Sequence, residues 1–399
     1  MEIRCLKCKG RGFCGRKVCP HVMKLNSMAN ARKRHTKTEF SSQSPAPFIG
    51  RFGYPDVNVG VLSPPENSKD TWKYDSPKYW SKTNYDIPRL VNIRADLLNS
   101  KFKSSVKGNI SQVQEVGLAQ RPVDMDFFLQ DKPRFRMQSN SVTAPTGPDA
   151  HLQKADITSN PKIGRKVDKV YSDTDMKATD AINYLYKSGY DESFVSKIMS
   201  VGGIGKDRKL VPTRWSITAA DDTVGKNLIE EVSLYKQINE HTAYFGEYLG
   251  NYYLIMLLPG LWGYELFETY VGKNFAGSPE YTTDYENHTG RKHYAYNCAG
   301  GYYSVRLAIL EKLREMKRRA TCVVVRVITG DYSVPLGVWV TREASRKALA
   351  NDALRFSSKE LMLNYARLML NKKFGIRKGE IIKDSKLLKV KQNTLDKFC

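Results

Sequence analysis

The chain has 399 residues, enough for two or three domains, and it is strongly basic. It carries 64 lysine and arginine residues against 41 aspartate and glutamate residues, a formal net charge of +23. Hydrophobic residues make up 41% of the sequence, which excludes a wholly disordered protein. Such a charge favours a polyanionic partner, of which nucleic acid is the commonest, and an acidic membrane surface is the alternative.

The composition gives no sign of a membrane-spanning segment. The most apolar stretch, residues 252–267, contains Pro259, Gly260 and Glu265 and predicts buried strands. The first residues lack the apolar core of a signal peptide. We therefore expect a cytoplasmic protein with reduced thiols and no membrane partner.

Four of the seven cysteines, Cys5, Cys8, Cys14 and Cys19, are spaced C-x2-C-x5-C-x4-C. Four thiolates so close together suit a tetrahedral structural zinc site, and the glycines between them allow tight turns. An iron–sulfur cluster is the alternative metal centre. Free or redox-active thiols are the alternative without metal, and His21 could replace one cysteine as a ligand.

These cysteines lie on a basic arm, residues 1–40. Residues 1–37 contain eleven Lys or Arg and one Glu. A metal knuckle on such an arm is typical of a module that contacts nucleic acid, and a solvated leader is the alternative. By composition, residues 41–47 predict a linker.

The next part of the chain predicts short strands and helices. Extended pieces are expected at 48–62, an irregular loop at 63–88, a helix at 89–98 and strands within 104–150. Helices are expected at 175–188 and 192–199. A strand containing Arg214 should then lead into a helix that runs to about residue 239. A hairpin is expected around the turn dipeptide Gly250-Asn251.

The following segment predicts a helix over 302–320, with Val305, Ile309 and Leu313 facing the core. Lys317, Arg318 and Arg319 crowd its C-terminal end and are candidate nucleic-acid contacts. Strands are expected at 322–329 and 334–341, helices at 342–355 and 358–373, and a flexible basic tail at 376–399. The sequence thus predicts an α+β fold with mostly antiparallel sheets, and a mixed α/β arrangement is the alternative.

The last eight residues resemble the peptide by which replication and repair proteins dock on the DNA sliding clamp of the proliferating-cell nuclear antigen type. Gln392, Leu395 and Phe398 fit its pattern Gln-x-x-Leu-x-x-Phe. One helical turn would bring Leu395 and Phe398 onto one face as a small apolar plug. Cys399 stands where a second aromatic residue is usual, which should lower the affinity, and a frayed terminal helix is the alternative.

The segment Gly202–Asp222 is the best internal site candidate. Its glycines could expose backbone N–H groups to a phosphate, and Lys206, Arg208 and Arg214 could contact a DNA backbone. Asp207 follows Lys206 where a Walker A loop has Ser or Thr, so nucleotide hydrolysis gets little support. A flexible connection between two elements is the alternative.

Asp221 and Asp222 are low-ranking catalytic candidates in the same segment. Paired acids at the end of a strand could hold a divalent ion for phosphodiester cleavage. Helix capping is the more ordinary role of Asp at such a position. A metal-dependent enzyme acting on DNA or a nucleotide is therefore the alternative function.

Several strings together resemble the archaeal Nre family of DNA repair proteins. They are the four-cysteine knuckle, residues 48–55, 57–60, 210–218 with Asp221-Asp222, 300–303 and the C-terminal peptide. The resemblance implies a long N-terminal region, placed here at 48–285, and a shorter C-terminal region at 290–375. It also implies a role in the DNA damage response and clamp binding, without a settled catalytic activity. The leading hypothesis is a DNA repair protein or adaptor that works with DNA, the clamp and other repair proteins. An RNA-binding protein of translation is a third possibility.

Overall fold

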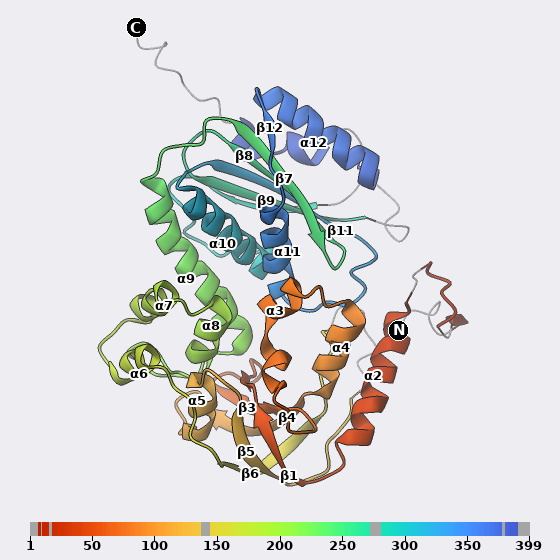
Figure 1. The fold of residues 1–399 in the computed structure, drawn as a ribbon, viewed down its shortest axis with the longest axis vertical. Coiled ribbons are helices and arrows are strands. Elements are labelled where there is room, and N and C mark those ends of the chain that lie inside the picture. Colours follow the sequence, from red (N-terminus) through yellow and green to blue (C-terminus); the bar gives the residue numbers. More distant parts are fainter. Residues whose placement is uncertain are drawn as a thin grey trace. The chain divides into compact units, whose positions relative to one another are not determined.

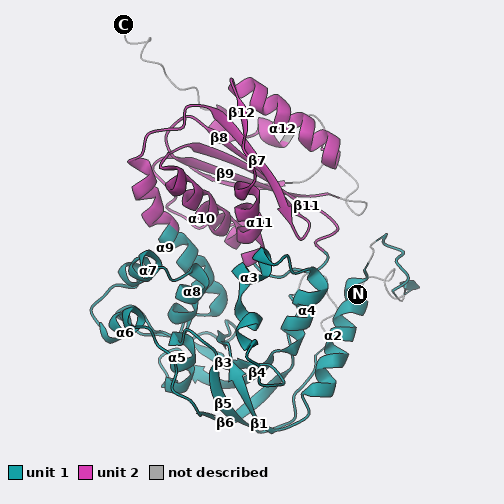
Figure 2. Ribbon diagram, viewed as in Figure 1, with its two compact units in different colours: residues 1–224, 333–337 teal, residues 225–332, 338–399 magenta. Residues whose placement is uncertain are grey.

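The computed structural model describes residues 7–8, 10–15, 18–136, 144–271, 281–376 and 380–389 (Figure 1). The chain divides into two units, residues 1–224 with 333–337 and residues 225–332 with 338–399 (Figure 2). Each unit has one six-stranded sheet with helices on it, which confirms the expected α+β class. The long helix α9 (Thr213–Ser233) crosses from the first unit into the second.

The sheet of the first unit has the strand order β1-β5-β6-β4-β3-β2, and only the pair β4 and β6 is parallel. Alternation of buried and partly exposed residues along β5 matches a strand with one face in the core. The strands are β1 (Glu39–Ser44), β2 (Ala46–Ile49), β3 (Asp56–Ser63), β4 (Leu98–Ser105), β5 (Val123–Leu129) and β6 (Asp149–Ile157).

The prediction of a linker at residues 41–47 is wrong, because these residues belong to β1 and β2 at the two edges of the first sheet. β1 pairs with β5 in a register that places Phe40 opposite Phe127. Its polar side chains do not prevent pairing, since backbone groups form the ladder. Pro47 is tolerated because β2 is an edge strand.

Helices of the first unit pack on this sheet and on each other (Figure 1). The arm is not a loose leader after residue 20: α2 packs on α4, with Ser27 bonded to Asn92 and an ion pair between Arg34 and Asp96. The loop expected at 63–88 contains two short helices. The helical elements are α2 (Pro20–Arg34), η1 (Thr71–Asp75), α3 (Pro77–Lys82), α4 (Ile87–Asp96), α5 (Ser111–Leu118), α6 (Arg165–Ser172), α7 (Ala178–Lys187) and α8 (Glu192–Ser200).

The sheet of the second unit has the order β10-β9-β11-β8-β7-β12, and only β9 and β11 are parallel. The hairpin predicted around Gly250-Asn251 is confirmed: β7 and β8 pair with Tyr248 opposite Asn251. The strands are β7 (His241–Tyr248), β8 (Asn251–Leu258), β9 (Gly263–Tyr270), β10 (Tyr281–Glu286), β11 (Thr321–Ile328) and β12 (Leu354–Phe356).

Three longer helices accompany this sheet: α10 (Ala299–Met316), α11 (Trp339–Ala350) and α12 (Lys359–Phe374). One face of the sheet forms a core with Met362, Ala366 and Leu370 of α12. The strand predicted at 334–341 is wrong, since α11 begins at Trp339. Pro335 and Gly337, whose φ is 105°, interrupt that apolar run.

The described residues of the basic tail, 376 and 380–389, pack on the second unit, contrary to the prediction of a flexible segment from residue 376. Ile376, Ile381 and Ile382 are buried in the core of the second unit. Two one-turn helices, α13 (Glu380–Lys383) and α14 (Lys386–Lys389), carry the chain along the edge of this core. A one-turn helix needs only an isolated apolar pair to pack against the core, so the sequence shows no helical period in this segment.

The units do not coincide with the regions expected from the sequence. A division near residues 285–290 falls inside the second sheet, because β10 ends at Glu286 and β11 and β12 follow it. The compact units separate within α9 instead. None of the helices that the structure describes combines the length and the apolar character needed to cross a membrane.

Candidate functional site

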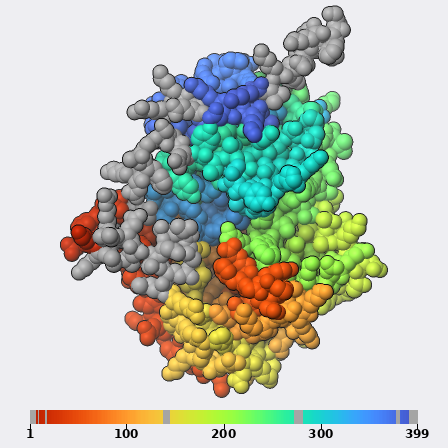
Figure 3. All heavy atoms as spheres, turned by 180° about the vertical axis from the view of Figure 1, so that it is seen from behind, coloured from red at the N-terminus to blue at the C-terminus, as the bar shows by residue number. Residues whose placement is uncertain are grey.

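Three of the four clustered cysteines lie in the described part of the chain, and Cys5 lies outside it. The backbone N–H of Phe13 donates to Cys8 Sγ at 3.3 Å, and the Arg11 N–H closes a turn on the Cys8 carbonyl. The bond from Phe13 lowers the pKa of the Cys8 thiol. The thiolate is the form of cysteine that binds metal, so a cysteine whose sulfur accepts an N–H bond is suited to be a metal ligand. The segment, red in Figure 3, lies at the molecular surface.

Two buried cysteines of the second unit have the opposite character. Burial raises the pKa of Cys298 and Cys322, which keeps them as thiols. Across the described residues, no group of three or more Cys, His, Asp or Glu side chains is placed to hold a metal. The described cysteines Cys8, Cys14 and Cys19 are therefore not gathered as three ligands. Because Cys5 lies outside the described residues, the four-cysteine centre stays a prediction.

Two glycines of the segment after α8, Gly202 and Gly203, do not offer free N–H groups to a phosphate. The N–H groups of Gly202 and Gly203 donate to the carbonyls of Met199 and Ile198 and so end α8. Both glycines are buried, and a Cβ on Gly203 would lie 2.9 Å from the Ile198 side chain. The left-handed backbone of Gly202, φ 69°, and the close packing of Gly203 against α8 account for these two glycines.

Two of the cations that follow these glycines, Lys206 and Arg208, have different roles. Arg208 donates to three backbone carbonyls, those of Gly203, Val170 and Asp173, at 3.0, 3.4 and 2.8 Å. It ties the segment to the end of α6 and is a structural residue. Lys206 is exposed and stays a candidate phosphate contact.

We expect Arg208→Ala to lower the free energy of unfolding by about 1.5–3 kcal/mol, the usual contribution of hydrogen bonds from a charged group. Lys206→Ala should change it by less than about 0.5 kcal/mol, because the side chain is on the surface. Urea unfolding followed by circular dichroism measures both. Equal midpoints for the two variants would contradict the structural role of Arg208.

Asp221 and Asp222 lie inside a helix, which corrects the prediction of a strand followed by a capping pair. The segment rich in β-formers, 213–218, is the first part of α9, which begins after Pro212. Thr213 Oγ1 accepts the N–H of Ile49 and contacts Ser200 Oγ. These tertiary bonds outweigh the local preference for a strand.

Successive helical positions point about 100° apart, so Asp221 and Asp222 do not form a paired site. Asp221 is buried and Asp222 is half-buried. The described carboxylates therefore give no geometric support to a metal-dependent cleavage site here. Arg214 is exposed on the first turn of α9.

The basic end of α10 is only partly available for contact with nucleic acid. Lys317 is exposed and ends the helix with a left-handed backbone, φ 52°. Arg318 is half-exposed, and its Nη1 donates to the Lys317 carbonyl. Arg319 Nη1 donates to the Ser233 carbonyl and so supports the fold. Lys236 is also exposed, and its carbonyl accepts the N–H of Arg319.

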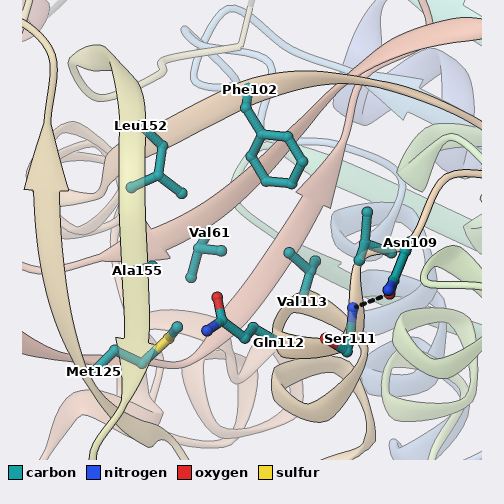
Figure 4. A pocket seen from close by; sticks show the side chains of 10 residues that line it. Val61, Phe102, Asn109, Ser111, Gln112, Val113, Met125, Leu152 and Ala155 are labelled. Carbon is teal, nitrogen blue, oxygen red and sulfur yellow. Dashed lines mark hydrogen bonds between the residues drawn. The ribbon is translucent and has the colours of Figure 1, made fainter.

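A pocket of about 170 Å³ lies between α5 and the first sheet (Figure 4). No ionisable side chain occurs among the described residues that line it, so it offers no acid–base chemistry. The pocket could not be predicted from the sequence, because its walls come from segments up to 94 residues apart. The lining residues are Val61, Phe102, Asn109, Ile110, Ser111, Gln112, Val113, Met125, Leu152 and Ala155.

The predicted clamp-binding residues Gln392, Leu395 and Phe398 lie outside the described residues. The chain just before them is anchored: the buried carboxylate of Glu265 accepts bonds from Ser385 Oγ and from the N–H groups of Lys386 and Leu387. Lys359 Nζ also donates to the Leu388 carbonyl. The predicted clamp-binding peptide therefore begins at Gln392, three residues after the end of α14 at Lys389.

Models of one protein family match almost the whole chain. The family model for the N-terminal part of archaeal Nre proteins matches residues 13–275, and that for the C-terminal part matches residues 286–398. No solved structure matches the chain.

Three curated relatives are each named as a DNA repair protein. NreB of Archaeoglobus fulgidus is 36% identical over 377 residues, which cover 91% of this chain and 94% of that protein. NreA of the same organism is 35% identical, with coverage of 90% and 91%. NreA of Haloferax volcanii is 35% identical over 329 residues, 78% of each chain.

Proposed function

The chain belongs to the archaeal Nre family, and from this premise we propose that it is a DNA repair protein that binds DNA and docks on the sliding clamp. The similarity to proteins named for DNA repair over 91% of the chain carries the proposal. The proposal includes a cytoplasmic location and contact with other repair proteins.

Clamp docking is supported by the last eight residues and by their attachment. Leu395 and Phe398 supply the aliphatic and aromatic members of a docking turn. The anchor of α14 on Glu265 fixes the chain shortly before this turn. A short connection keeps the bound clamp near the second unit, so clamp and DNA contacts can act together.

A zinc ion on Cys5, Cys8, Cys14 and Cys19 is part of the proposal, with an iron–sulfur cluster as the alternative. The ion would supply a structural cross-link. The N–H of Phe13 would hold the Cys8 sulfur as a thiolate, and the neighbouring basic side chains would offset the negative charge of the site.

DNA binding is supported by the net charge of +23 and by exposed cations, among them Lys206, Arg214 and Lys317. Contacts from such residues to phosphates release counterions, so the affinity should fall as salt rises. They carry no sequence code, and binding to different duplexes should be similar.

The variant Lys317→Gly should change DNA affinity and protein stability in opposite directions, so it distinguishes the two effects. We expect the variant to gain about 1 kcal/mol in the free energy of unfolding, because glycine adopts the left-handed backbone without the Cβ penalty. Its duplex affinity should fall, and the slope of log affinity against log salt should decrease by about 0.9. Fluorescence anisotropy with a labelled duplex at several salt concentrations measures both quantities.

Lys317→Arg retains the charge and should bind the duplex like the parent protein. An unchanged affinity and slope for Lys317→Gly would remove this end of α10 from the DNA-binding surface. Affinity of the parent protein that ignores ionic strength would contradict DNA binding through phosphates altogether.

A further inference from the structure

The first unit carries a group of exposed aromatic side chains that the proposed function does not yet use. Phe48, Phe52, Tyr54 and Trp215, the aromatic patch, are 42, 75, 45 and 46% exposed. Tyr54 and Trp215 contact each other, with ring centroids 5.3 Å apart and planes tilted by 51°. Large aromatic side chains usually bury most of their surface in a core, so their exposure together indicates a binding surface.

Tertiary structure holds this patch in place. The bond from the Ile49 N–H to Thr213 Oγ1, 2.9 Å long, joins the end of β2 to the start of α9. The loop that follows β2 turns tightly, with the Asp56 N–H donating to the Gly53 carbonyl at 2.8 Å. Gly53 has φ 84°, and a Cβ there would lie 2.7 Å from the Asp56 carbonyl oxygen. This tight loop therefore presents Phe52 and Tyr54, β2 presents Phe48, and the first turn of α9 presents Trp215.

Exposed cations accompany the rings. The Arg51 guanidinium lies 4.9 Å from the centre of the Phe52 ring, and Arg214 precedes Trp215. Lys103 Nζ approaches within 3.5 Å of the place where a Gly53 Cβ would stand. In the part of the chain that the structure describes, none of these three cations forms an ion pair with a carboxylate. Asp56 is the one acid among residues 48–58.

We propose that the aromatic patch, together with Arg51, Lys103 and Arg214, binds the unpaired nucleotides of single-stranded DNA. Bases stack on aromatic rings whatever their sequence, and the cations would contact the phosphates between them. Unpaired positive charge favours this partner over an apolar protein surface, which would leave the cations without counterions. The inference rests on the proposed function and specifies which form of DNA this surface takes.

The test uses the full-length protein, a fluorescent oligodeoxythymidine and a duplex of equal length. Phe52→Ala and Trp215→Ala should each weaken single-strand binding by about 5- to 150-fold, since stacking contributes about 1–3 kcal/mol per base. Duplex binding should change little. Trp215→Phe should retain most of the affinity, because it keeps a ring at the position.

Leu368→Ala is the matched control, since Leu368 is an exposed apolar residue of the second unit and should not affect binding. Circular dichroism and thermal unfolding verify that each variant is folded. A parent protein that binds no DNA at low salt would overturn both the proposed DNA binding and this inference.

A parent protein that binds DNA while Phe52→Ala and Trp215→Ala bind the oligonucleotide unchanged would overturn the inference alone. Equal losses for the duplex and the single strand would also overturn it, because stacking requires unpaired bases. Loss of clamp binding with unchanged DNA binding would assign the surface to a protein partner instead.

Discussion

Deleting residues 392–399 should abolish binding to the sliding clamp and leave the fold unchanged. Leu395 and Phe398 are the only large apolar side chains after Val390, so they must supply most of the buried area. Burying each side chain contributes about 1.5–3 kcal/mol, before the cost of ordering the peptide. Micromolar affinity is therefore expected. Titration calorimetry with the purified clamp measures the loss.

The structure shows where the truncation can safely end. A chain that stops at Lys391 keeps α14 and its bonds to Glu265, so its thermal stability should equal that of the parent protein. Deleting residues 380–399 also removes Ile381 and Ile382 from the core and should lower stability. The longer deletion therefore shows how much stability is lost when core residues are removed, which the shorter deletion should not show.

Cys399→Phe should tighten clamp binding, because it restores the second aromatic residue of the docking pattern. Phe398→Ala should weaken it, but by less than the deletion does, because Leu395 remains. A protein without residues 392–399 that still co-migrates with the clamp would place the docking site elsewhere.

Removing one clustered cysteine should release a metal ion from the N-terminal segment. The purified protein is expected to contain about one zinc per chain, and Cys8→Ser should contain far less, because a closed site needs all four ligands. Apparent binding free energies of structural zinc sites are about 10–16 kcal/mol at neutral pH, so the loss should unfold the segment around the site. Elemental analysis and limited proteolysis measure these effects.

Cys298→Ala is the matched control for this experiment. Cys298 is buried in the second unit and its pKa is raised, so its removal should leave the zinc content unchanged. Equal zinc content in Cys8→Ser and the parent protein would reject the four-cysteine site. Iron with a visible charge-transfer band would assign an iron–sulfur cluster instead.

Local patterns in the sequence were sufficient for several elements. The hairpin of β7 and β8 was readable from Gly250-Asn251 between two β-rich runs, because turn chemistry acts over a few residues. The helices predicted at 192–199 and 358–373 are confirmed as α8 and α12, and in the structure the side chains of Asp191 and Ser358 cap them. Gly375, in the left-handed region, ends α12.

Elements that form through contacts with distant segments of the chain could not be predicted from the sequence. Residues 41–47 look like a linker, yet they pair with residues 14 to 85 positions further along the chain. The segment 213–218 favours a strand by composition, and bonds to Ile49 and Ser200 accompany its helical form. The backbone follows tertiary contacts wherever local preferences are weak.

The sequence by itself determined the basic charge, the cysteine cluster, the C-terminal peptide and the family, since these are properties of composition and spacing. Only the tertiary structure decided the use of individual side chains. Arg208, predicted to contact phosphate, instead donates to backbone carbonyls and supports the fold. Asp221, predicted to lie at the end of a strand, is buried within α9. It also brought Tyr54 and Trp215 together across 161 residues of chain. The physical reason is that burial and contact depend on how distant segments pack, which no short stretch of sequence encodes.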